Sequence, residues 1–421
     1  MPDKDQKEFT FMSEQLKKKP FYKKRWFQKG LGAGALAVIF GMTAGVTFAV
    51  IQPWAKKQFG EPEDPAKVFV VREETETETA PPQTETQEKA VPQTVIEQKD
   101  LEIADYKMLY EKMAEVAESV SPAIVTVTCE TSNLDWFNEV IENHVQASGL
   151  VIAQNQEEYF ILTEGQALDQ AERTIVTFSD GMTVEASLQK QDSVTGLAVV
   201  RVLKSELSEE TKNIIPAKLS PSEMIKKGEP VIALGTPVSN ETSMSFGMVT
   251  SVVDTPAVDS QYNVLSTDIL GSEQGSGILV DLDGDIVGII AQNFSAGNSQ
   301  ITLTALAAYD IQGLVTDLAN NKERPRIGIT GKEIDAAIAK EFDMPEGIYV
   351  RSVAEDSPAM YAGVYEADII TSIDSGEIRT IDEYEEEIQR HSPDEYIKLG
   401  IKRATMDGYV DIEVPVQLGR R

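Results

Sequence analysis

Imidazole and thiol groups, the usual side chains for nucleophilic and metal chemistry, are scarce in this chain. It has two histidines, His144 and His391, and one cysteine, Cys129. A single cysteine can form no intrachain disulfide and no cysteine-based zinc site. We expect His144 in an exposed loop before an apolar run, and His391 at a helix end, where it caps the helix or is solvated. No set of His, Cys, Asp and Glu has metal-ligand spacing, so the sequence predicts no metal and no cofactor.

The composition is that of a globular protein with an acidic surface. Of 421 residues, 41% are hydrophobic and 25% are charged, and the formal net charge is -31. A chain of this length predicts two or three domains. Because phosphate binding needs clustered Lys and Arg, the composition excludes nucleic acid from the expected partners. We interpret the acidity as a contribution to solubility.

An apolar segment near the amino terminus predicts a membrane anchor. Residues 30–51 carry no charged side chain, which at helical rise is long enough to cross a hydrocarbon core of about 30 Å. Seven Lys and Arg residues lie between positions 17 and 29. The positive-inside rule therefore predicts a cytoplasmic basic tail at 1–29, a single-pass transmembrane anchor at 30–52 in the cell membrane, and the bulk of the chain outside the cytoplasm. A cleaved signal peptide is the alternative, but no small-x-small cleavage site stands out.

The rest of the chain divides into a linker and two folded units. Residues 53–100 are rich in Glu, Thr, Gln and Pro, which predicts a disordered, acidic, extended linker. Residues 101–320 begin with a helical pattern at 101–120 and continue as short runs rich in Val, Ile and Thr, typical of an all-β barrel or sandwich. A helical pattern at 305–318 closes this unit. Residues 324–419 mix strands with helical stretches at 334–342 and 381–390, which indicates a smaller α+β unit.

Three blocks in the first folded unit resemble the HtrA (DegP-like) serine proteases. Residues 161–168 resemble the family's strand motif I-[LV]-T-N-x-H-V, and residues 192–200 resemble D-x-x-T-D-L-A-V-L. Residues 267–284 resemble T-D-A-x-x-x-G-N-S-G-G-P-L-x-N-x-x-G, the block that carries the nucleophile. The blocks keep their order and spacing. The resemblance therefore implies a mainly β fold class, a chymotrypsin-like double β-barrel followed by an α+β PDZ domain.

The resemblance also implies that two members of the catalytic triad are missing. A serine protease needs a nucleophile, a base that takes its proton and a carboxylate that orients the base. Gln166 stands at the position of the catalytic histidine and Gly196 at that of the aspartate. An amide cannot accept and return a proton near neutral pH, and glycine has no side chain with which to orient a base.

The position of the nucleophile stays open between two registers. Counting back from the following strand places Gly275 there, whereas counting forward from the Thr-Asp pair at 267–268 places Ser276 there, because the loop is one residue short. Glu273 and Gln274 replace the glycine that shapes the family's oxyanion hole, in which two backbone N–H groups bind the developing charge.

Residues 326–418 resemble the PDZ domain that follows the protease in this family. Arg326, Ile327, Gly328 and Ile329 stand at the carboxylate-binding loop, and Ala367 replaces a glycine of the family pattern. Such a loop binds the terminal carboxylate of a peptide on backbone N–H groups while the peptide adds a strand to a sheet edge. We expect Gly328 to allow close backbone approach, and Arg326 either to supply a favourable charge or to be solvated.

These features together predict a membrane-anchored, extracytoplasmic pseudoprotease. Its expected partners are exported or misfolded proteins and carboxy-terminal peptides, bound through the PDZ and barrel domains. The alternative is an active serine endopeptidase of envelope protein quality control. A third hypothesis is a homotrimer, or a mixed oligomer with active relatives, by analogy with the family.

Overall fold

The computed structural model describes residues 102–134, 140–166, 168, 171–221, 225–238, 242–295 and 302–421. The predicted tail, anchor and linker at 1–29, 30–52 and 53–100 lie outside these residues. None of the described helices is long and apolar enough to span a membrane.

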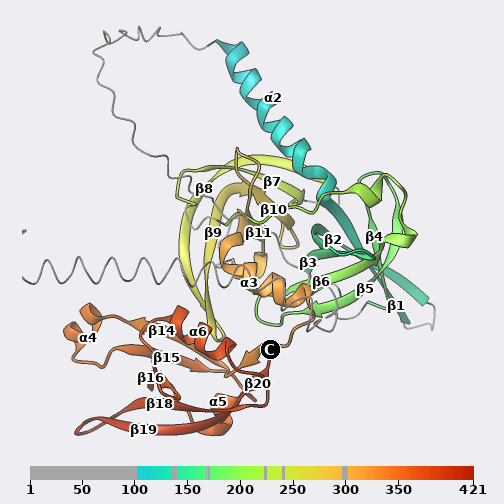
Figure 1. Ribbon diagram of the computed structural model, residues 1–421. Coiled ribbons are helices and arrows are strands. Elements are labelled where there is room, and N and C mark those ends of the chain that lie inside the picture. Colours follow the sequence, from blue (N-terminus) through green and yellow to red (C-terminus); the bar gives the residue numbers. More distant parts are fainter. Residues whose placement is uncertain are drawn as a thin grey trace, which may run out of the picture. The chain divides into compact units, whose positions relative to one another are not determined.

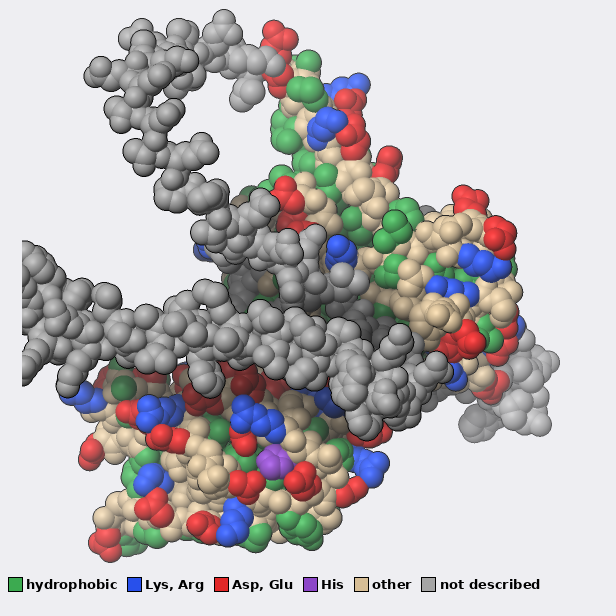
Figure 2. Space-filling model, in the orientation of Figure 1, with side chains coloured by type: hydrophobic (Ala, Val, Ile, Leu, Met, Phe, Trp, Pro, Cys, Tyr) green, Lys and Arg blue, Asp and Glu red, His purple; other side chains and the backbone are tan. Residues whose placement is uncertain are grey.

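Helix α2 (Ile103–Val120) confirms the helix predicted at 101–120, and a 3₁₀ turn, η2 (Ser121–Ala123), ends it at the Ser-Pro pair. Ala117 is buried, and the ring of Tyr110 meets Phe246 edge to face at 5.5 Å. The amino-terminal half of the helix is exposed, and Figure 2 shows hydrophobic side chains along it. The helix therefore packs from Tyr110 onward, and its first two turns are exposed.

Six strands close into a first barrel, because alternate residues of each strand face a common core. Val125, Val127 and Cys129 are buried, whereas the intervening Thr126 and Thr128 are partly exposed. The hydrogen-bonded order is β1-β2-β3-β6-β5-β4. The strands are β1 (Ile124–Leu134), β2 (Val140–Gln154), β3 (Glu158–Glu164), β4 (Arg173–Thr177), β5 (Thr183–Gln191) and β6 (Leu197–Leu203), and the turns η3 (Lys204–Glu206) and η4 (Thr211–Asn213) follow.

A second closed barrel has the order β10-β11-β12-β9-β8-β7. Figure 1 labels β7 to β11 of this barrel. Its strands are β7 (Pro230–Thr236), β8 (Ser243–Ala257), β9 (Ser260–Leu270), β10 (Ser276–Val280), β11 (Ile286–Ile290) and β12 (Thr302–Ala307), with a 3₁₀ turn η5 (Gln292–Phe294). Helix α3 (Ala308–Ala319) closes the unit. The helix predicted from Ala305 begins three residues later, because residues 305–307 still pair with β9 and β11. Tertiary pairing overrides the local helical pattern there.

The carboxy-terminal unit is a sheet in the order β14-β15-β16-β18-β19, with β17 beside β16, flanked by short helices. The elements are β13 (Pro325–Arg326), β14 (Ile329–Ile334), α4 (Ala336–Phe342), β15 (Gly347–Val353), α5 (Pro358–Ala362), β16 (Ile369–Ile373), β17 (Gly376–Glu377), α6 (Ile381–Gln389), β18 (Tyr396–Thr405), β19 (Gly408–Gln417) and β20 (Gly419–Arg420). The helix predicted from Ile334 begins at Ala336, because Ile334 ends β14 and the Asp335 carboxylate caps the helix. Strand β14 lies at the edge of the sheet, where a further strand can pair.

Candidate functional site

Ser276, one of the two nucleophile candidates, lies at the start of β10 and is only 2% exposed. Its Oγ accepts a hydrogen bond from the Ser148 N–H at 2.8 Å and lies 2.8 Å from the Thr236 Oγ1. The Ser148 Oγ accepts from the Thr236 N–H at 2.7 Å and lies 2.9 Å from the Thr236 Oγ1. We call Ser148, Thr236 and Ser276 the hydroxyl cluster. It joins β2 of the first barrel to β7 and β10 of the second.

The partners of the Ser276 hydroxyl are the other two members of this cluster. The Ser148 hydroxyl donates to the Ser276 carbonyl at 3.3 Å, whereas either hydroxyl can be the donor in the Ser148–Thr236 and Thr236–Ser276 pairs. Neither a serine hydroxyl nor a threonine hydroxyl acts as a base near neutral pH.

Glu164 is the one ionisable side chain among the described residues that line the cavity beside Ser276. Burial raises the pKa of its carboxyl group, which is a property that general bases often have. The hydrogen bonds of the Ser276 hydroxyl nevertheless go to Ser148 and Thr236. The cavity holds about 20 Å³, enough for one water molecule but not for a peptide.

The turn before β10 is closed by two backbone hydrogen bonds, one of which uses the Gly275 N–H. The Ser272 N–H donates to the Pro237 carbonyl at 3.0 Å, and the Gly275 N–H donates to the Ser272 carbonyl at 3.0 Å. A Cβ atom at Gly275 would lie 2.5 Å from the Pro237 oxygen, closer than real contacts allow. Neither register therefore presents an exposed hydroxyl, and in the Gly275 register the N–H at the nucleophile position is already bonded.

The other two triad positions do lie together. The Gly165 N–H donates to the Gly196 carbonyl at 2.7 Å, which brings the exposed residue Gln166 close to Gly196. Gly196 has φ +76°, and a Cβ there would approach the Asn293 Nδ2 at 3.4 Å. The Asn293 side chain donates to the Thr195 carbonyl at 3.1 Å. An amide side chain therefore occupies the space next to Gly196.

His391 lies at a helix end as predicted, but its burial and the position of His144 differ from our expectation. His144 lies on strand β2, not in a loop, and its exposed ring faces Glu130, with 3.8 Å between Nδ1 and Oε1. His391 follows α6, but its side chain is only 16% exposed and lies between Asp374 at 3.7 Å and Glu395 at 3.3 Å. Strand pairing and carboxylate neighbours, which sequence spacing does not reveal, explain the two differences. Within the described residues, no three His, Cys, Asp or Glu side chains are grouped to hold a metal ion.

The predicted carboxylate-binding loop, residues 326–329, joins β13 to β14 and is built around Gly328. Gly328 has φ +95°, and a Cβ there would lie 2.3 Å from the Cβ of Ser357. The positive φ and this neighbour both favour glycine. Ile327 and Ile329 are buried in the core of the unit. The side chains therefore anchor the loop while its N–H groups point the other way.

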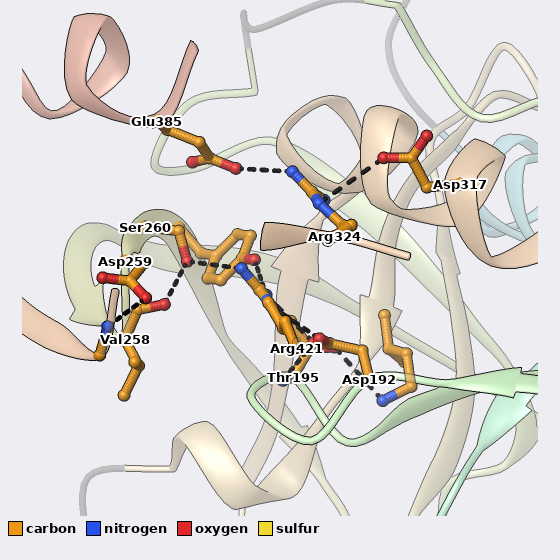
Figure 3. A network of polar contacts seen from close by, with 12 residues as sticks. Asp192, Thr195, Val258, Asp259, Ser260, Asp317, Arg324, Glu385 and Arg421 are labelled. Carbon is orange, nitrogen blue, oxygen red and sulfur yellow. Dashed lines mark hydrogen bonds and ion pairs between the residues drawn. The ribbon is translucent and has the colours of Figure 1, made fainter. Parts of the chain in front are cut away.

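Those N–H groups converge on the carboxylate of Asp259, from the turn between β8 and β9. The Ile327 and Gly328 N–H groups donate to Oδ2 at 2.8 and 2.6 Å, and the Ile329 N–H donates to Oδ1 at 3.1 Å. Figure 3 shows Asp259 beside Val258 and Ser260 in this turn. Arg326 pairs through its backbone with Gly419, and its N–H is not among the donors to Asp259. The loop thus binds a carboxylate in this structure.

A tyrosine on α6 completes this carboxylate site. The Tyr384 hydroxyl donates to the Asp259 Oδ1 at 2.9 Å. Burial, and the negative charge of Asp259 beside it, raise the pKa of Tyr384 well above its usual value, so the hydroxyl stays a donor. Neither Tyr384 nor Asp259 was among the predicted site residues. No local signal marks them, because they lie 125 positions apart.

A buried ion pair holds the same unit to the first barrel (Figure 3). The Arg421 Nε and Nη2 donate to the two oxygens of Asp192 at 2.6 and 3.1 Å, and both side chains are 2% exposed. Burial alone would raise the pKa of Asp192, but its hydrogen bonds and the charge of Arg421 outweigh burial and lower that pKa. Thr195, next to Gly196, also donates to Asp192 through its N–H at 2.8 Å. The loop between β5 and β6, which carries Asp192 and Gly196, is therefore packed against the carboxy-terminal unit.

Sequence and structure comparisons agree with this architecture. Residues 147–289 match the trypsin-like peptidase domain, and residues 325–414 match the PDZ domain. The two closed barrels and the following unit define the class: a chymotrypsin-like double barrel with a PDZ domain, which confirms the expected mainly β fold. This combination of a trypsin-like peptidase domain and a PDZ domain is HtrA-like.

Individual relatives support this assignment. The chain is 27% identical over 296 residues to the serine protease Do-like HtrA of Bacillus subtilis, covering 64% of this chain and 65% of that protein. It is 25% identical to a probable periplasmic serine endoprotease DegP-like of Halomonas elongata, covering 62% of this chain and 54% of that protein. The chain thus spans between half and two thirds of these two relatives. The structure of the HtrA-type protease AlgW with a decapeptide is similar in fold, with a TM-score of 0.51 and 22% identity, over 73% of this chain and 98% of that one.

Proposed function

We propose that this HtrA-like chain is a pseudoprotease that binds exported or misfolded proteins and carboxy-terminal peptides. The observation that carries the proposal is the Ser276 hydroxyl, which is buried and bonded to Ser148 and Thr236. Without a base that takes its proton, a serine hydroxyl attacks amide bonds very slowly. Loss of the nucleophile or the base in a serine protease costs about 10⁶-fold in kcat.

The closed turn before β10 supports the same proposal independently. The Gly275 N–H is bonded to Ser272 and is not free to stabilise a tetrahedral intermediate. Preorganised backbone donors usually contribute about 10²–10³-fold to kcat. The buried hydroxyl and the bonded backbone N–H therefore both support the pseudoprotease proposal.

The carboxylate-binding loop supports the binding part of the proposal. Three backbone N–H groups of the loop already hold a carboxylate in this structure. A peptide that ends beside β14 needs the same donors and a free sheet edge. We place this activity on the outer side of the cell membrane, tethered by the predicted anchor at 30–52, and we include assembly as a homotrimer or a mixed oligomer with active relatives.

One observation favours the alternative of an active serine endopeptidase. Glu164 has a raised pKa and lines the same small cavity as Ser276. A rearrangement that brought its carboxylate to the hydroxyl would supply a base. The Glu164→Gln variant separates the hypotheses, because it abolishes hydrolysis only if this carboxylate acts as that base.

The decisive experiment uses residues 102–421 with unfolded casein and a fluorophosphonate probe. We expect no labelling of Ser276 and no casein cleavage above that of the Ser276→Ala variant. An active HtrA-family protease is the positive control. Probe labelling at Ser276, or cleavage that Ser276→Ala removes, refutes the pseudoprotease proposal. For the anchor, deletion of residues 30–52 should move the full-length chain from the membrane to the soluble fraction.

A further inference from the structure

The turn between β8 and β9 is docked on the edge of the PDZ sheet like a bound peptide. The Asp259 N–H donates to the Ile329 carbonyl at 2.7 Å, and Val258 forms an antiparallel bridge with Thr330 of β14. Strand β8 packs against β14, and β9 packs against α6. The turn therefore lies where a peptide would add a strand to this sheet.

The side chain of Asp259 takes the place of a terminal carboxylate. Its oxygens accept hydrogen bonds from the Ile327, Gly328 and Ile329 N–H groups and from the Tyr384 hydroxyl. The residue is only 5% exposed. A buried carboxylate is expensive unless its lone pairs are satisfied, and here four donors satisfy them.

An internal ligand and an external one cannot use this loop at the same time. Each backbone N–H has a single hydrogen, and all three are directed at Asp259. The neighbouring edge of β14 is paired with Val258. A peptide must therefore displace the whole turn.

Further contacts between the barrels and the PDZ domain keep the internal ligand close to the loop. Arg421 binds Asp192 in the buried ion pair, and Arg324 lies between Asp317 of α3 at 3.6 Å and Glu385 of α6 at 3.0 Å. A tethered ligand competes at a high effective concentration, which lowers the apparent affinity for any free ligand.

We propose that Asp259 is an internal ligand of the carboxylate-binding loop, and that a peptide with a free terminal carboxylate binds this PDZ domain only by displacing the β8–β9 turn. The inference rests on the proposed peptide binding and adds its regulation. A peptide then reaches the carboxylate-binding loop only when the PDZ domain and the β8–β9 turn of the second barrel move apart.

The test compares peptide binding by three forms of residues 102–421. The probe is a pool of fluorescein-labelled decapeptides with apolar final residues and free carboxy termini, measured by fluorescence anisotropy. The same pool with amidated termini is the ligand control. The proteins are the unmodified chain, Asp259→Ala and Asp254→Asn. Asp254 lies exposed on the same hairpin, so its variant matches the change in charge without touching the loop.

We expect Asp259→Ala to bind the carboxylate pool about 10- to 100-fold more tightly than the unmodified chain, as charge-assisted hydrogen bonds of this kind imply. Asp254→Asn should bind like the unmodified chain, and the amidated pool should bind to none of them. Equal affinity of the unmodified chain and Asp259→Ala overturns the internal-ligand inference but leaves peptide binding intact.

Hydrogen exchange provides a second readout that needs no peptide. We expect the amides of Ile327, Gly328 and Ile329 to exchange at least tenfold faster in Asp259→Ala and in the isosteric Asp259→Asn than in the unmodified chain. Unchanged exchange in both variants refutes the docking of Asp259 in the loop. If exchange accelerates but no form binds the carboxylate pool, peptide binding itself is refuted, and displacement by a peptide with it.

Discussion

Replacing the Ser276 hydroxyl should lower stability rather than activity. In Ser276→Ala the buried Ser148 N–H loses its acceptor, and Thr236 loses one of its hydroxyl partners. An unsatisfied buried donor costs about 1–3 kcal/mol, and a lost neutral hydrogen bond costs about 1 kcal/mol. We therefore expect the free energy of unfolding to fall by about 2–4 kcal/mol.

Urea unfolding of residues 102–421, followed by far-ultraviolet circular dichroism, measures this loss. At an m-value of about 1–3 kcal/mol/M, the midpoint should fall by roughly 1 M or more with m unchanged. Ser187→Ala is the matched control, because Ser187 is exposed on β5 and its loss should change stability by less than about 0.5 kcal/mol. Ser276→Ala combined with Thr236→Val should show a coupling energy of about 0.5–3 kcal/mol.

Two outcomes would refute this reasoning. One is an unchanged midpoint in Ser276→Ala, which would mean that the hydroxyl cluster does not join the barrels. The other is additive effects of Ser276→Ala and Thr236→Val, which would mean that the two hydroxyls do not interact. Either result would leave the Ser276 hydroxyl free to serve another purpose and would weaken the pseudoprotease proposal.

Three further predictions concern charge and backbone conformation. Ala367→Gly should stabilise the fold by about 1 kcal/mol, because Ala367 has φ +69° in the left-handed region that glycine adopts without strain. The gain should be measurable as a higher melting temperature. The folded-state pKa of Asp192 is lowered, so its ion pair with Arg421 stabilises the fold fully above the unfolded pKa of about 3.9, and this stability is lost as pH falls through the folded pKa. Asp192→Asn should lose about 3–5 kcal/mol at pH 7, measured by urea unfolding, and the loss should become smaller as pH falls below about 3.9. Burial raises the pKa of Glu164, so the folded state loses stability as pH rises from the unfolded pKa through the folded pKa. Glu164→Gln should therefore have a higher melting temperature than the unmodified chain at pH 7 and the same melting temperature at pH 4.

The fold could be predicted from sequence because the family motifs and the strand patterns each lie within a short, contiguous segment. The runs that became β6 and β11 are almost continuously apolar; β11 is buried throughout, and β6 is buried except at Arg201 and Leu203. Two helices begin two or three residues later than predicted, because the residues predicted to start them, Ala305 and Ile334, belong to strands. Local helical periodicity cannot report a partner strand that lies elsewhere in the sequence.

The candidate sites were predictable only in part, for the same reason. Motif spacing indicated Gln166, Gly196 and the loop around Gly328. It could not choose between Gly275 and Ser276, because a one-residue deletion leaves the register to hydrogen bonds across the barrels. Motif spacing could not indicate Asp259, since an aspartate in a turn is common and its partner Ile327 lies 68 positions later.

The difference between this barrel and a catalytic one lies in the backbone as much as in the missing side chains. A serine at position 275 would meet the Pro237 carbonyl, and any side chain at 196 would need a left-handed backbone. The Gly275 N–H would still be bonded to Ser272. Restoring histidine, aspartate and serine at the three positions therefore leaves the hydroxyl without room and the oxyanion without the Gly275 N–H as a donor. In such a barrel the surviving hydroxyl at 276 is better explained by the joint between β2, β7 and β10 that it completes, because the same oxygen cannot accept the buried Ser148 N–H and also turn outward to a substrate.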